Sequence, residues 1–123
     1  MTDIDWTNPA EAALALGRVV NVWRTHVERA TSSRERAAAL RKRPSPPPAG
    51  VSDEDWRGFP DLLDAQAADW ESSAAADAEA FRSAVASAVE GGRLTRTQAG
   101  QLTGASSLEE AEAAVAALKR DLF

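Results

Sequence analysis

Residues 44–50 read PSPPPAG, and this stretch separates two long segments of the chain. Successive prolines lack an amide hydrogen and have fixed backbone φ angles, so they end a helix that reaches them and form a semi-rigid extended spacer. Such a stretch can also be a proline-motif ligand, but it is more often a simple connector. We therefore interpret residues 44–50 as a linker between two helices.

The segment before the linker has the pattern of one long helix. Asn8 is a candidate N-cap, followed by Pro9 at the first helical position. Apolar and small residues then recur at alternating spacings of three and four, a heptad-like stripe. The stripe consists of Ala12, Leu16, Val19, Trp23, His26, Ala30, Ser33, Ala37 and Leu40. We predict a helix over residues 9–43, in which the weak helix formers at 31–33 allow a bend or a second helix start.

The segment after the linker carries a second stripe. Ser52 is a candidate N-cap for a short helix that the Gly-Phe-Pro sequence at 58–60 is expected to break. A long helix is then predicted over residues 61–90, closed by Gly91 and Gly92. Its stripe consists of Leu63, Ala67, Trp70, Ala74, Ala78, Phe81, Val85 and Ala88.

Two capping boxes, beginning at Thr95 and Ser107, predict a closing pair of shorter helices. The fold class is therefore all-α. We expect two long Ala-rich helices, joined by the Pro-rich linker and the short helix, to pack antiparallel beside a C-terminal helical hairpin. The corresponding segments are 1–43, 44–50, 51–92 and 93–123, which we expect to form one domain.

The composition narrows the class of protein. Of 123 residues, 27 are Ala, and none is Cys, which excludes disulfides and thiolate zinc sites. The sequence contains no apolar run as long as a membrane span and no signal peptide, so we expect a cytoplasmic protein without membrane contact. Arg outnumbers Lys by 12 to 2. This bias suggests a high-GC bacterium or its phage, and a virion location if a phage encodes the chain.

The charges are unevenly distributed along the chain. Residues 18–43 contain eight basic and two acidic side chains, whereas residues 51–90 contain ten acidic and two basic ones. The basic block could contact phosphates, or it could complement the acidic helix within the chain or between chains. We favour the second interpretation, because the acidic block has a matching length and follows immediately.

Residues 94–106, LTRTQAGQLTGAS, resemble the first helix and turn of helix-turn-helix DNA-binding units. This resemblance implies that the next helix would read DNA. That helix begins with Leu108-Glu109-Glu110, which places carboxylates where phosphates and base edges would lie. A plain helical hairpin explains the same residues.

The sequence offers no recognisable catalytic, cofactor-binding or metal-binding site. It has no Gly-x-Ser-x-Gly elbow, phosphate-binding glycine loop or calcium-loop spacing. His26, the one histidine, lies on the apolar stripe, where a packed or register-setting residue is more common than a ligand. We therefore expect a protein that is not an enzyme and needs no cofactor.

We predict a helical protein–protein interaction or assembly subunit that forms a homo-oligomer or a larger assembly, such as a phage particle or a bacterial complex. The alternative is a nucleic-acid-associated protein that uses the basic residues 18–43, the hairpin 95–118, or both. Aromatic anchors and exposed arginines dominate most interfaces. The candidate interface residues are Trp23, His26, Trp56, Trp70, Phe81, Arg34, Arg36, Arg41 and Arg43.

Overall fold

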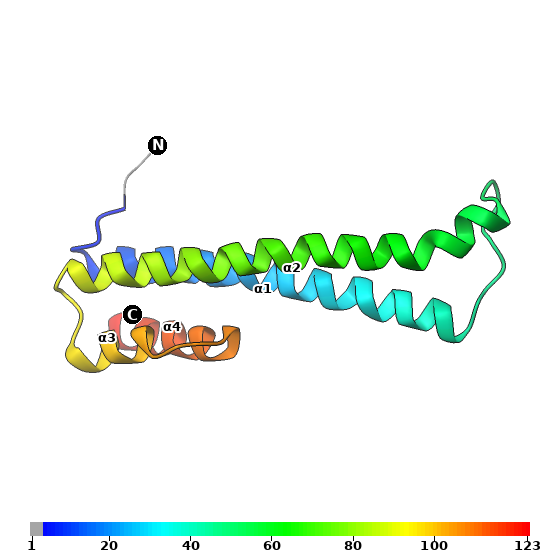
Figure 1. Ribbon diagram of the computed structural model, residues 1–123. Helices are drawn as coiled ribbons and strands as arrows, with labels where there is room; N and C mark the ends of the chain where they lie inside the picture. Colours follow the sequence, from blue (N-terminus) through cyan, green and yellow to red (C-terminus); the bar gives the residue numbers. More distant parts are fainter. Residues whose placement is uncertain (1–3) are drawn as a thin grey trace. The chain divides into compact units, whose positions relative to one another are not determined.

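The computed structural model describes residues 4–123 and contains four helices and no strand among them (Figure 1). The helices are α1 (Pro9–Lys42), α2 (Asp53–Glu90), α3 (Arg96–Thr103) and α4 (Leu108–Leu122). The all-α prediction is confirmed, as are the two long helices, the connecting Pro-rich segment and the C-terminal helical pair. α1 is continuous through residues 31–33, so the alternative of a second helix start there was wrong.

The described chain divides into two compact units. Unit 1 contains the described residues up to Arg24 together with Ala75–Phe123, and unit 2 is Thr25–Ala74. The first half of α1, the second half of α2, and both short helices therefore belong to unit 1. Unit 2 contains the rest of α1, the linker and the first half of α2.

Unit 1 has one shared hydrophobic core, to which all of its helices contribute. Its largest fully buried side chains are Leu16 of α1, Leu102 of α3 and Leu118 of α4, while α2 supplies Phe81 and Val85. Leucine and phenylalanine bury far more apolar area than alanine, so these side chains provide most of the hydrophobic stabilisation of unit 1.

Unit 2 is a pair of antiparallel helix segments with a thin seam. The seam consists of Ala30, Ser33 and Ala37 on α1, against Leu63, Ala67 and Ala74 on α2. The Ser33 hydroxyl donates to Oε1 of Gln66 at 3.3 Å, which gives this buried polar group a partner. Small side chains allow the two segments to approach closely, but they bury little apolar area.

The predicted stripes are the faces that the structure buries. No member of either stripe is exposed, although several are only half-buried. The four tryptophans are all half-buried rather than central. The side chains that fill the centre of the larger core are leucines, because only unit 1 has enough packed helices to enclose a large residue completely.

The helix starts mostly follow the predicted caps. Oδ1 of Asn8 accepts from the backbone N–H of Ala10 at 3.1 Å, and Oγ of Ser52 accepts from that of Asp55 at 3.1 Å. The capping box of α3 is complete: Thr95 Oγ1 accepts from the backbone of Gln98, whose side chain accepts from the backbone of Thr95.

One local prediction was wrong, and another was confirmed only in part. α2 does not break at residues 58–60 but continues through Pro60, which is buried. Proline has a helix-compatible φ and removes one backbone hydrogen bond, a loss that a helix can absorb by bending. The second capping box is half-formed: Ser107 accepts from the backbone of Glu110, but the Glu110 carboxylate accepts from the hydroxyls of Ser106 and Ser107 instead of the cap backbone.

Candidate interaction surfaces

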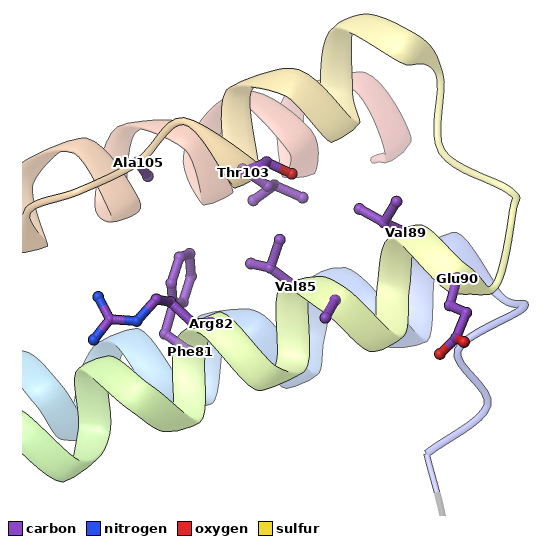
Figure 2. Close-up of a pocket in the computed structure, with 9 residues that line it drawn as sticks. Phe81, Arg82, Val85, Val89, Glu90, Thr103 and Ala105 are labelled. Atoms are coloured by element: carbon purple, nitrogen blue, oxygen red, sulfur yellow. The ribbon is translucent and has the colours of Figure 1, made fainter.

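Unit 1 has an open groove of about 500 Å³ between the second half of α2 and the end of α3. Figure 2 shows Phe81, Val85 and Val89 of α2 pointing from one wall toward Thr103 and Ala105 on the other, whereas Glu90 points away from them. The lining residues are Phe81, Arg82, Val85, Ala86, Val89, Glu90, Leu102, Thr103 and Ala105. α3 is only eight residues long and ends at Thr103, and Val89 of α2 remains 40% exposed beside it.

The centre of this groove is apolar. Phe81, Val85 and Leu102 form its floor and belong to the core of unit 1, whereas Val89 is 40% exposed. These α2 residues recur at intervals of four, so they lie along one face of the helix. Burial of the remaining exposed part of this face by another molecule would be favourable.

Charged residues stand at both ends of the α2 wall. Arg82 forms an ion pair with Glu79, one turn earlier on the same helix. Glu90 is the last residue of α2, whose final turn lies within the described residues and contains no basic side chain. A carboxylate at a helix C-terminus faces the negative end of the helix dipole, an unfavourable position without a nearby cation. The α2 wall of the groove therefore carries a cation toward one end and an anion at the other.

Two of the predicted aromatic anchors meet beside this groove. The rings of Trp23 and Phe81 are 6.0 Å apart at a tilt of 46°, and both pack in the core of unit 1. Phe81 is buried, so it stabilises the core of unit 1 and also lines the groove. The structure thus places Trp23 and Phe81 in one cluster, as candidate anchors from different helices.

Two other predicted residues meet in unit 2. The His26 ring stacks on Trp70 with centroids 5.3 Å apart, and the Arg29 guanidinium lies 4.9 Å from the Trp70 ring centroid. Such a cation–π contact is favourable at a partly exposed site. Arg29 was not among the predicted interface residues, although it belongs to the basic block and lies one turn after His26.

The predicted arginines divide into two groups. Arg41 contacts Asp61 at 2.8 Å and Asp64 at 2.7 Å, while Arg34 pairs with Glu71 and lies 3.6 Å from Asp64. Within unit 2, part of the basic block therefore complements the acidic helix. Arg36 and Arg43 are exposed and lie outside this ion-pair cluster.

These ion pairs also shift the pKa values of the side chains that form them. The hydrogen bond from Arg34 lowers the pKa of Glu71, and the same bond raises the pKa of Arg34. The pKa of Arg41 is raised by its hydrogen bonds to Asp64 and Asp61. Because these side chains are about half exposed, solvent screens the attraction.

Trp56 anchors the linker within unit 2. Its indole N–H donates to the carbonyl oxygen of Ser45 at 2.8 Å, and its ring stacks on Phe59 at 5.1 Å. A cavity of about 430 Å³ adjoins it, lined in part by Pro44, Pro47 and Pro60. The Pro-rich segment is therefore bound by its own chain in this structure.

The hairpin that resembles a helix-turn-helix packs into unit 1. In α4, Ala111, Ala114, Val115 and Leu118 are buried. Glu112 forms a 2.8 Å ion pair with Arg24 of α1. One acidic residue of the helix that would read DNA thus contacts a basic residue of the chain itself.

Comparison with known protein families, curated proteins and solved structures finds no match to this chain. Residues 4–123 contain no cluster of three or more His, Cys, Asp or Glu side chains that could hold a metal ion. None of the helices described there has the length and apolarity that crossing a membrane requires.

The sequence reasoning missed most residues of the groove. Arg82, Val89 and Glu90 were not selected, because they lie beside the buried stripe rather than on it. A sequence pattern that could have identified these residues is an apolar residue beside the buried stripe, Val89, together with two opposite charges about two helical turns apart, Arg82 and Glu90.

Proposed function

We propose that this protein is a non-enzymatic interaction subunit that binds a protein partner in the groove between α2 and α3. The main observation in support of this proposal is the open apolar groove of about 500 Å³, whose α2 wall has Arg82 and Glu90 at its ends. An apolar centre with a charged rim is the usual composition of a protein-binding surface. We place this subunit in a larger assembly, such as a bacterial complex in the cytoplasm or a phage particle.

Nucleic-acid binding is the less favoured alternative. Phosphates would have to compete with Asp61, Asp64 and Glu71 for Arg34 and Arg41. Nucleic-acid binding gains much of its affinity when Lys and Arg side chains neutralise phosphates and release the counterions bound to them, and arginines that must first break ion pairs with carboxylates gain less. The protein-binding proposal requires no such competition.

Site-specific photo-crosslinking in the cells that produce the protein tests the proposed function. A photoreactive amino acid at Ala86, which lines the groove, is expected to give a discrete crosslinked polypeptide. The same group at Ala65, an exposed residue of α2 in unit 2, is the matched control. Val89→Lys should abolish the Ala86 product, whereas Leu62→Lys, at a 65% exposed site in unit 2, should leave it unchanged.

Two results would contradict the proposal. One is an Ala86 yield no higher than the Ala65 yield. The other is an Ala86 product that persists in Val89→Lys while circular dichroism shows that the variant is folded.

A further inference from the structure

The α2 wall of the groove has a symmetric order of charges. Arg82 lies four residues before Ala86, and Glu90 lies four residues after it. Four residues correspond to about 6 Å along a helix, slightly more than one turn. The three residues therefore form one ridge, with a cation and an anion at roughly equal distances from a small central side chain.

We infer that the partner in this groove is a second copy of the same chain, related by a two-fold axis beside Ala86. The inference rests on the proposed function and names its partner. In an antiparallel pairing of the two ridges, each Arg82 lies opposite Glu90 of the other copy. The small Ala86 side chains at the centre allow the two helices to approach closely, and each exposed Val89 is covered by the other copy's groove.

The charge order selects this arrangement over a parallel pairing. In a parallel pairing, Arg82 would face Arg82 and Glu90 would face Glu90, and like charges in contact are strongly unfavourable. A two-fold interface must be self-complementary, because the same patch is used by both copies. A ridge with opposite charges at equal distances from its centre meets this requirement.

The environment of each charged residue fits the same pairing. Glu90 ends α2 at the negative end of the helix dipole, so a cation from another copy would relieve an unfavourable position. Nη2 of the Arg82 guanidinium contacts Oε1 of Glu79. An arginine has five N–H donors, so Arg82 can retain this ion pair and donate to a second carboxylate.

Charge reversal tests the inference directly. Sedimentation equilibrium and light scattering are expected to show a wild-type dimer. Arg82→Glu and Glu90→Arg each create two like-charge contacts, because the interface is symmetric, and each should raise the dimer dissociation constant by more than about tenfold. An equimolar mixture of these two variants restores both attractive contacts and should form a heterodimer. The double variant Arg82→Glu/Glu90→Arg should form a homodimer but should not pair with the wild type.

Matched controls separate this effect from net charge. Arg36→Glu and Glu35→Arg make the same charge changes at exposed positions of α1 in unit 2 and should leave the dissociation constant unchanged. A wild-type monomer at all concentrations up to about 1 mM would overturn the inference. A dimer whose dissociation constant is unchanged by the charge reversals would overturn it as well. A monomer that still gives a Val89-dependent crosslink to another protein at Ala86 would leave the proposed function intact. A monomer without such a crosslink would overturn both.

Discussion

The indole N–H of Trp56 donates to the backbone carbonyl oxygen of Ser45 at 2.8 Å and so ties the first turn of α2 to the Pro-rich segment. Ser45 lies just past the end of α1, and the prolines that follow it cannot donate backbone hydrogen bonds. The tryptophan therefore fixes the linker by a single directed hydrogen bond and by packing.

Trp56→Phe should lower the stability of unit 2 by about 1 kcal/mol, because it removes this hydrogen bond but retains an aromatic ring beside Phe59. Thermal unfolding followed by circular dichroism measures the change. Leu62→Ala, at a 65% exposed position nearby on α2, is the control and should change stability little. An equal melting temperature for Trp56→Phe and the wild type would show that the hydrogen bond does not stabilise the linker.

Replacing a glycine by alanine should change the stability in opposite directions at two positions, Gly58 within α2 and Gly91 in its C-terminal turn. A Cβ atom at Gly91 would lie 2.2 Å from the carbonyl oxygen of Trp6, so Gly91→Ala must displace backbone and should destabilise unit 1 by about 1–3 kcal/mol. A Cβ at Gly58 meets no atom within 4 Å, and Gly58→Ala should stabilise α2 by up to about 1 kcal/mol. Denaturant unfolding of both variants measures the changes. Equal effects of the same sign would contradict the close approach at Gly91.

The arginine ion pairs should contribute to folding rather than to nucleic-acid binding. Arg34→Gln/Arg41→Gln should lower the melting temperature slightly at low salt, and the difference should shrink as salt screens the wild-type ion pairs. In the same buffers, we expect no electrophoretic retardation of duplex or single-stranded DNA by the wild type. Retardation that weakens steeply with salt and disappears in the double variant would instead support the nucleic-acid alternative.

The Glu71–Arg34 pair predicts a specific acid dependence. The hydrogen bond from Arg34 holds the pKa of Glu71 below its ordinary value of 4.5. A carboxyl group with a lowered pKa in the folded state adds stability above its unfolded pKa, and this contribution is lost as pH falls through the folded pKa. Glu71→Gln should therefore melt below the wild type at pH 7, and the difference should shrink as pH falls below 4.5 through the lowered pKa of Glu71. Asp69→Asn on the same helix is the control, and a difference that does not shrink as pH falls would contradict the assignment.

The helical framework could be predicted from the sequence because its signals are local. Asn8, Ser52 and Thr95 are caps whose side chains satisfy backbone groups within three residues, and Gly92 has the positive φ of 73° that closes α2. The break expected at Pro60 did not occur, because a local rule cannot include the packing that holds a proline inside a helix. The same limit applies to the tryptophans, whose burial depends on how many helices surround them.

The candidate site could be predicted only in part. Trp23 and Phe81 were selected because they lie on the buried stripes, and this position also makes them structural. The groove depends on how much of α2 the short α3 leaves uncovered, and that is a tertiary property. The placement of Arg82, Val89 and Glu90 along the groove therefore depends on how α3 packs on α2, which the local sequence pattern does not contain.

The two units should differ in local stability, because their cores differ in kind. The buried side chains of unit 2 are mainly alanines with Leu63, whereas unit 1 encloses Leu16, Leu102, Leu118 and Phe81. Local opening requires less free energy where less apolar area is buried. In native-state hydrogen exchange, backbone amides at residues 30–40 and 63–74 should therefore exchange faster than those at 12–20 and 81–88. Leu118→Ala, which should destabilise unit 1 by about 2–5 kcal/mol, is expected to reduce or reverse this order. Equal protection of both units in the wild type would mean that they unfold together, and that the alanine seam is as stable as the leucine core.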